Sequence, residues 1–185
     1  MNDDGVHDDQ VIGAALHAEL LERGTTLATA ESITGGALAD LVSASPGASE
    51  TYLGGVVSYA TEAKVRVLGV SPETVEKHGV VSAECAAEMA RGARELLGTQ
   101  WAVSTTGVAG PTEQEGKPVG LVYVGVAGPD GAHSEELRLD GDRAEIRHQA
   151  CLMAAHLVME RLVGRDHQPG SRFPRCSGGE VSPLR

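Results

Sequence analysis

Aromatic residues make up only 3% of this 185-residue sequence, and there are only three cysteines. Cys85, Cys151 and Cys176 are far apart and odd in number, which excludes a disulfide framework and a C-x-x-C metal or redox pair. Residues 1–9 are acidic and do not resemble a signal peptide, and no apolar run approaches the roughly 18 residues of a membrane span. We therefore expect a cytoplasmic protein that lies outside the membrane.

Basic residues are also scarce, because 15 lysines and arginines stand against 26 aspartates and glutamates, giving a formal net charge of -11. A general nucleic-acid or anionic-membrane surface needs a basic face that displaces counterions or meets lipid head groups. We therefore expect neither nucleic acid nor membrane as a partner, although a local basic pocket is compatible with this charge. The sequence shows no cluster of metal ligands, so we expect no metal and no other cofactor.

What the sequence does contain is alanine, valine, leucine and glycine. Hydrophobic residues make up 41% of the chain and glycines number 24, in a length that suits one compact domain with a real core. This composition is typical of a tightly packed sheet with many turns, and it predicts an α/β fold.

Hydrophobic periodicity divides the chain into amphipathic helices and short β-rich runs. The predicted helices cover residues 8–23, 34–43, 62–68, 71–78, 82–97 and 142–163. The predicted strands cover residues 25–29, 52–59, 101–106, 119–127 and 133–139, and the last two form an antiparallel hairpin. Residues 166–185 are rich in Pro, Gly, Ser and Arg, which predicts a flexible tail and leaves a single domain at 8–165.

The stretch Ala-Glu-Ser-Ile-Thr-Gly-Gly at 30–36 is a strand-to-helix turn. It places Ser32 at the carboxyl end of a strand, where the active sites of α/β enzymes lie. The N–H groups of Thr34, Gly35 and Gly36 are candidates to face an anion or a developing oxyanion. Ser32 is therefore a candidate nucleophile, and the alternative is that it only caps the helix.

A second candidate pair follows the strand at 52–59, which delivers Tyr59 at its carboxyl end. Thr61 is a plausible N-cap, so Lys64 falls in the first turn of the next helix. The helix dipole and burial both lower the pKa of a lysine in such a place, and a neutral lysine can act as a base. The alternative is a solvated lysine that pairs with Glu62.

Two further features suit a small anionic ligand. Thr105 and Thr106 end a predicted strand that runs into a glycine-rich turn at Gly107–Gly110, and two such turns on neighbouring strands would form a crevice. Arg143 and Arg147 lie four residues apart in the first turns of the last helix. Cations are unfavourable at the positive end of the helix dipole, so this arginine pair suggests a bound phosphate or carboxylate. The alternative is that nearby acidic residues neutralise the two arginines: Asp140, Asp142 and Glu145.

Taken together, these stretches resemble the carboxyl-terminal domain of the CinA family, over about residues 10–163. The matching motifs are AESITGG at 30–36, YLGGVVSYATEAKVRVLGV at 52–70, HGVVS at 78–82, TTGVAGP at 105–111, KPVGLVYVGVA at 117–127 and GDRAEIR at 141–147. The resemblance implies a single three-layer α/β/α domain, here with a mixed sheet, and a phosphate-bearing nucleotide substrate.

Active members of that family are nicotinamide-nucleotide amidases, which convert nicotinamide mononucleotide (NMN) to nicotinic acid mononucleotide and ammonia. The resemblance implies that Ser32 is the nucleophile and Lys64 its base, with Tyr59 and either Thr105 or Thr106 beside them. The chain departs from the family pattern at Ile33, where cysteine is frequent, and in a shorter loop at 112–116. We also expect the activity of the amino-terminal domain of longer relatives to be absent.

Two other functions remain open at this point. The glycine turns and arginines would equally serve a non-catalytic nucleotide-binding module. A Ser/His hydrolase would use His78 or His133 as its base, although neither comes with a persuasive orienting carboxylate. The sequence also leaves open whether the chain forms a homo-oligomer.

Overall fold

The computed structural model describes residues 3–164, with side chains from Asp9 onward. The predicted flexible tail at 166–185 and Cys176 lie outside the described residues. In chain order the elements are α1 (Asp3–Glu22), β1 (Leu27–Glu31), α2 (Ala37–Ser43), the 3₁₀ turn η1 (Ala48–Glu50), β2 (Tyr52–Val57), α3 (Thr61–Leu68), α4 (Pro72–His78), α5 (Ala83–Leu97), β3 (Trp101–Gly107), β4 (Leu121–Gly128), β5 (Gly131–Arg138) and α6 (Arg143–Leu162).

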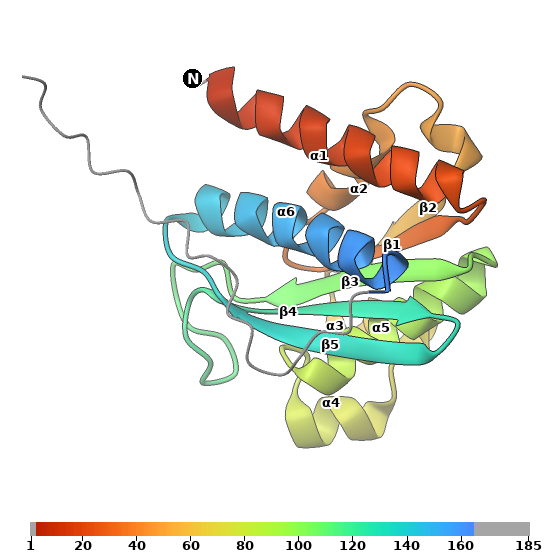
Figure 1. The fold of residues 1–185 in the computed structure, drawn as a ribbon. Helices are drawn as coiled ribbons and strands as arrows, with labels where there is room; N and C mark the ends of the chain where they lie inside the picture. The colour runs from red at the N-terminus through yellow and green to blue at the C-terminus, as the bar shows by residue number, and fades with distance from the viewer. Residues whose placement is uncertain (1–2, 165–185) are drawn as a thin grey trace, which may run out of the picture.

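The five strands form one mixed sheet in the order β2-β1-β3-β4-β5. Strands β2, β1 and β3 are parallel, whereas β4 and β5 run antiparallel as the predicted hairpin. Helices α1, α2 and α6 cover one face of the sheet, and α3, α4 and α5 lie on the other (Figure 1). This confirms the predicted three-layer α/β/α fold. No helix within residues 3–164 is long and apolar enough to cross a lipid bilayer.

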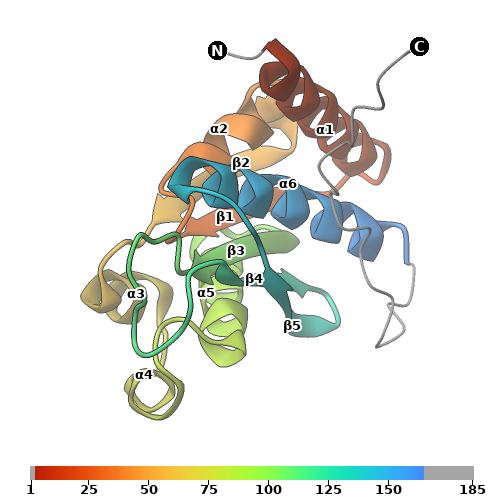
Figure 2. The same ribbon diagram turned by 90° about the vertical axis from the view of Figure 1, so that its left-hand side faces the viewer.

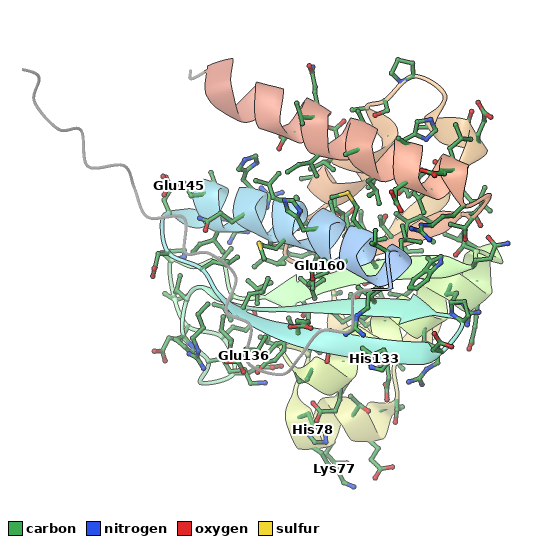
Figure 3. The ribbon with its side chains drawn as sticks, viewed as in Figure 1. Lys77, His78, His133, Glu136, Glu145 and Glu160 are labelled. Carbon is green, nitrogen blue, oxygen red and sulfur yellow. The ribbon has the colours of Figure 1, made fainter. Side chains whose placement is uncertain are left out.

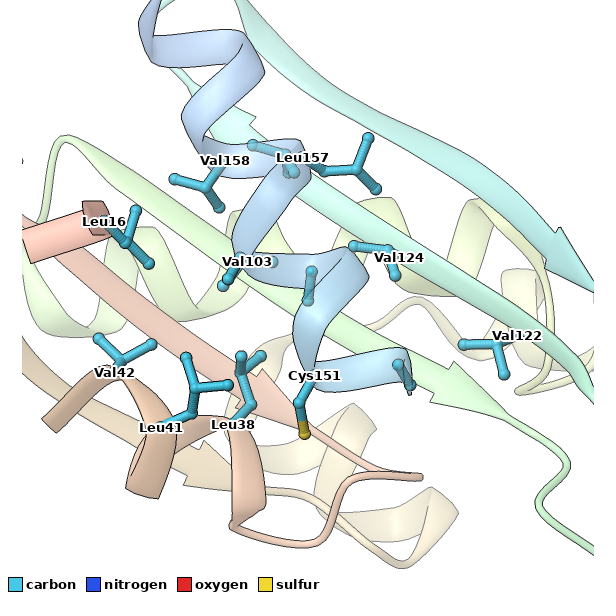
Figure 4. Close-up of a cluster of buried hydrophobic side chains, with 14 of the residues drawn as sticks. Leu16, Leu38, Leu41, Val42, Val103, Val122, Val124, Cys151, Leu157 and Val158 are labelled. Atoms are coloured by element: carbon cyan, nitrogen blue, oxygen red, sulfur yellow. The ribbon is translucent and has the colours of Figure 1, made fainter. Parts of the chain in front are cut away.

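Two apolar clusters hold the layers together, one on each face of the sheet. Figure 4 shows the first, in which α6 contributes Leu157 and Val158 against Val103 and Val124 of the sheet. The second cluster packs α5 against the other face, with Met89 fully buried. The central strand β3 is buried at every position between its two ends, as expected for a strand covered by helices on both faces.

The sheet brings the two predicted turns side by side. Glu31 at the end of β1 is in register with Thr105 of β3, and the Ser32 N–H donates to the Thr105 carbonyl oxygen at 2.9 Å. The carboxyl ends of these parallel strands therefore meet at one edge of the sheet, where ligands of open α/β sheets bind.

Several element boundaries differ from the predictions: β1 is Leu27–Glu31 rather than 25–29, β4 begins at Leu121 rather than 119, and β5 begins at Gly131 rather than 133. Three further differences lie next to the site. Thr34–Gly36 lie in a turn before α2, because Gly35 and Gly36 have φ of 60° and 103° and cannot continue a right-handed helix. Strand β2 ends at Val57, so Tyr59 lies in the connection to α3. Ala60 rather than Thr61 is the N-cap of α3, although Lys64 still falls at the start of that helix.

Candidate active site

Lys64 and Ser32 are in direct contact. The Lys64 Nζ lies 2.9 Å from the Ser32 Oγ, and it also donates to the carbonyl oxygens of Ser58 at 2.7 Å and Tyr59 at 3.3 Å. Two carbonyl oxygens thus bind the Lys64 amine, and its third hydrogen-bonding position faces the Ser32 hydroxyl. A neutral amine in this arrangement keeps two N–H bonds to the carbonyls and turns its lone pair toward the Ser32 proton.

Lys64 is almost completely buried, with 1% of its side chain exposed. Burial lowers its pKa from the ordinary value of 10.5, against smaller opposing effects of Cys85 and Glu115. The alternative of a solvated pair with Glu62 is wrong, because Glu62 instead pairs with Arg66 at 2.6 Å. Lys64 is therefore a buried lysine of lowered pKa in direct contact with Ser32.

Ser32 and Lys64 line a cavity of about 290 Å³ at the carboxyl edge of the sheet. Seven of the predicted site residues line it together: Ser32, Tyr59, Lys64, Thr106, Gly107, Gly110 and Arg143. The remaining predicted ligand-binding residues do not line it: Thr34, Gly35, Gly36, Thr105 and Arg147. This volume is near the lower end of the roughly 300–1,000 Å³ that small-molecule sites occupy.

The threonines serve mainly to support the site. The Thr34 hydroxyl donates to Glu31 at 2.7 Å and lies 2.7 Å from the Thr105 hydroxyl, and both side chains are fully buried. Thr106 donates to the Val80 carbonyl oxygen at 2.6 Å. These bonds tie the two turns and the neighbouring loop together.

Arg143 lies at the rim of the cavity and joins its two sides. Its guanidinium donates to the Gly110 carbonyl oxygen at 2.8 Å and to the Tyr59 hydroxyl at 3.0 Å. Tyr59 lies beside Lys64, as the resemblance implied, but its hydroxyl makes a different contact. Its hydroxyl is bound to Arg143 on an exposed side chain, and only its carbonyl oxygen contacts Lys64.

The acidic residues beside Arg143 do not neutralise it. Asp142 and Glu145 form a capping box that satisfies the first N–H groups of α6, and Figure 3 shows Glu145 at that end of the helix. Within residues 9–164 no ion pair to Arg143 is formed, so its charge is available to an anionic ligand at the rim.

Glu31 is the functional residue that the sequence interpretation missed. Its buried carboxylate accepts from the N–H groups of Gly36 at 2.8 Å, Leu38 at 3.1 Å and Ala39 at 2.8 Å. The signal was its position within the 30–36 motif, where an acidic residue ends a wholly buried strand. A buried carboxylate is stable there only if backbone donors surround it.

The loop at 108–120 forms one wall of the cavity, through Thr112, Glu113 and Gln114. These three residues belong to the segment 112–116, which is shorter than in the family pattern. Figure 2 shows this loop, in green, running past α3 toward α4. It is anchored by Glu115, which accepts from the Val80 N–H at 3.0 Å, and by Lys117, which donates to the His78 carbonyl oxygen at 2.7 Å.

The histidines of the alternative Ser/His mechanism lie elsewhere. His78 ends α4 and its ring lies 3.5 Å from Glu84, while His133 is on β5 beside a separate cavity with Trp101 and Arg161 (Figure 3). Neither lines the cavity that holds Ser32. In the described part of the chain, no three His, Cys, Asp or Glu side chains are grouped to hold a metal ion.

Comparison with known proteins agrees with this architecture. The family model of the CinA C-terminal domain matches residues 9–162. The chain belongs to that family. It is 49% identical over 160 residues to a CinA-like protein of Frankia casuarinae, covering 86% of this chain and 37% of that protein. It is 45% identical over 161 residues to a CinA-like protein of Synechocystis, covering 84% and 38%.

Solved structures of the family have the same fold. A CinA superfamily protein of Klebsiella pneumoniae superposes with a TM-score of 0.82 at 34% identity, covering 84% of this chain and 98% of that one. One from Escherichia coli gives a TM-score of 0.80 at 30% identity, covering 86% and 92%. The chain spans less than two fifths of the two curated relatives, 37% and 38%, and their names state the family but no reaction.

Proposed function

We propose that this CinA-family chain is a nicotinamide-nucleotide amidase, in which Ser32 is the nucleophile and Lys64 the general base. The observation that carries the proposal is the 2.9 Å contact between the Lys64 Nζ and the Ser32 Oγ. Lys64 is only 1% exposed, and burying an ammonium group is costly. A structural role alone therefore does not explain why this lysine is buried facing a hydroxyl. Activation of a weak nucleophile by a neutral amine accounts for the pair.

The substrate class follows from what surrounds this pair. The cavity suits a small molecule, and the Arg143 guanidinium at its rim suits a phosphate, which planar guanidinium groups bind through paired hydrogen bonds. NMN has a carboxamide at one end and a phosphate at the other. Its pyridinium ring also withdraws electrons from the amide, which makes the carbonyl carbon easier to attack.

Acylation begins when Lys64 takes the proton of Ser32 and the Ser32 Oγ attacks the carboxamide carbon. The carbonyl oxygen becomes an oxyanion, which backbone N–H groups at the cavity stabilise; one such donor contributes roughly 3–4 kcal/mol in related enzymes. Lys64 then returns its proton to the amide nitrogen, and ammonia leaves. The products of this half are an acyl-enzyme and ammonia.

Deacylation repeats the same steps with water. Lys64 takes a proton from the water, the hydroxide attacks the ester carbon, and the proton goes back to the Ser32 Oγ as the ester bond breaks. Nicotinic acid mononucleotide is released, and one amide and one water have become one carboxylic acid and one ammonia.

The test is ammonia release from NMN in the presence of EDTA, by the wild type, Ser32→Ala, Lys64→Met and His78→Ala. We expect release by the wild type and His78→Ala and a loss of about 10³-fold or more in the other two. Saturable NMN binding without release by the wild type would instead identify a non-catalytic nucleotide-binding module. Activity that survives in Ser32→Ala would rule out the serine mechanism.

A further inference from the structure

The backbone donors around Ser32 can be counted one by one. The N–H groups of Gly36, Leu38 and Ala39 donate to Glu31. Those of Ser32 and Ala37 donate to the carbonyl oxygens of Thr105 and Thr34. Five of the eight N–H groups from Ser32 to Ala39 are thus already in use, and none of the five can meet an oxyanion without losing its partner.

The three remaining N–H groups of this turn belong to Ile33, Thr34 and Gly35. Of these residues, only Ile33 lines the cavity that Ser32 and Lys64 share. Ile33 as a whole is 5% exposed and its side chain packs in the apolar core cluster, whereas its backbone directly follows Ser32 at the cavity. The donor that follows the nucleophile in sequence is therefore the one that remains for the reacting oxygen.

Arg147 holds the opposite side of the same turn. Its Nε donates to the Ile33 carbonyl oxygen at 3.1 Å, and its Nη2 donates to the Thr34 carbonyl oxygen at 2.6 Å. The guanidinium thus binds two successive carbonyls, which requires its rigid, planar arrangement of donors. The Thr34 carbonyl it binds also accepts from the Ala37 N–H at the start of α2.

We propose that Glu31 and Arg147 are positioning residues that fix the turn from both sides and aim the Ile33 N–H at the developing oxyanion. The carboxylate accepts from N–H groups at the end of the turn and in the first residues of α2, and the guanidinium donates to carbonyl oxygens within the turn. The proposal rests on the proposed serine amidase function. It also changes the expected role of Arg147 from a ligand of the substrate phosphate to a support of the nucleophile turn.

Arg143 and Arg147 provide a matched pair, one turn apart on α6, for a test of this division. In Arg147→Lys the charge remains but the bidentate contact is lost, so we expect kcat for NMN to fall about 10–100-fold with KM within twofold of the wild type. In Arg143→Gln we expect KM to rise about tenfold or more with a smaller change in kcat. A rise in KM for Arg147→Lys, without a fall in kcat, would return Arg147 to the substrate phosphate and overturn the proposal.

A second measurement does not depend on NMN being the substrate. A small fluorophosphonate forms a bond from the Ser32 Oγ to phosphorus with loss of fluoride, and its phosphoryl oxygen occupies the place of an oxyanion. We expect the labelling rate, followed by intact mass, to fall at least tenfold in Arg147→Lys and in Glu31→Gln, and to stay within twofold of the wild type in Arg91→Lys, at an exposed position on α5 away from the cavity. Thermal unfolding of each variant checks that the labelled protein is folded.

The outcomes separate the two proposals. Wild-type labelling at Ser32 with equal rates in folded Arg147→Lys and Glu31→Gln would overturn the positioning role while leaving the serine nucleophile in place. Absence of labelling at Ser32 in the wild type would overturn the nucleophile itself, and the positioning role with it. Slow labelling in both variants, together with the fall in kcat, is the result that the geometry predicts.

Discussion

Lys64 is the residue in which stability and chemistry conflict most directly. Its amine lies in the interior with 1% exposure, beside two carbonyl oxygens and a hydroxyl, and no carboxylate in the described structure pairs with it. Such a site favours the neutral amine, because the charged form loses its hydration. The cost of burying the group thus lowers its pKa, which is the change that the proposed base requires.

This residue gives a prediction about pH. We expect kcat/KM for NMN to rise with pH and to level off above an apparent pKa lower than 10.5, because only the neutral amine of Lys64 can accept the Ser32 proton. Lys64→Arg, whose guanidinium stays protonated, is the control, and its activity should be about 10²–10⁴-fold lower at every pH. A wild-type profile that falls as pH rises from 6 to 9 would contradict the role of Lys64 as the base.

At the same scale, sequence interpretation found the reacting atoms more readily than their supports. Ser32 and Lys64 were candidates from their places on a glycine turn and at a helix start, each with a structural alternative, and the resemblance to the CinA family then singled them out. Glu31 and Arg147 act through backbone N–H and carbonyl groups, which carry no side-chain signature, so only the folded geometry shows their roles. For the same reason Arg147 and Arg143 looked equivalent in the sequence.

At the scale of elements, α3 carries Lys64 and depends on how closely it approaches α5. Gly92 of α5 makes that approach possible, since a Cβ built there would lie 1.8 Å from the Leu68 carbonyl oxygen at the end of α3. The contact explains a glycine in the middle of a helix, where alanine would otherwise be favoured by about 1 kcal/mol.

We predict that Gly92→Ala destabilises the protein by about 2 kcal/mol, despite the better helix propensity of alanine, because α3 must move away from α5. The shift also displaces Lys64 from Ser32, so kcat should fall about tenfold or more. Urea unfolding and NMN turnover measure the two effects. Glu95→Ala, at an exposed position on the same helix, should change neither by much, and a Gly92→Ala protein as stable as this control would refute the close-contact argument.

The elements themselves were largely predictable. Runs of β-branched residues marked the strands, and Gly24, Gly69 and Gly98 marked helix ends. Two of the misplaced boundaries lie next to the site, at Thr34–Gly36 and Tyr59, where hydrogen bonds to Glu31 and from Lys64 and Arg147 decide the backbone path. Local propensity fails there because tertiary contacts override it.

At the scale of the whole molecule, the three-layer fold and membership of the CinA C-terminal domain family are shown, whereas the reaction and the homo-oligomeric state stay predictions. The chain carries a net charge of -11 and yet places the Arg143 guanidinium at the rim of the cavity. An acidic surface with a local basic site favours a small anionic ligand over a nucleic acid.

The buried lysine also affects global stability, in a direction that can be derived. The pKa of Lys64 is lower in the folded protein than its ordinary value of 10.5, so between the two values the unfolded chain binds more protons than the folded one. The free energy of unfolding of the wild type should therefore rise with pH through this window. At pH values below the window, the destabilisation caused by the buried amine is present in full. Lys64→Met lacks this titration.

We predict that the wild type gains stability relative to Lys64→Met as pH increases toward 10.5, measured by urea unfolding at several pH values. Ser32→Ala is the matched control, because it removes the hydroxyl partner but keeps the amine, and its stability should follow the pH dependence of the wild type. Cys85, whose pKa burial raises to about 11, interacts with Lys64, so all three proteins are compared in a common Cys85→Ala background. A constant difference between wild type and Lys64→Met across this range would mean that Lys64 is protonated alike in the folded and unfolded states, and the proposed neutral base would lose its thermodynamic support.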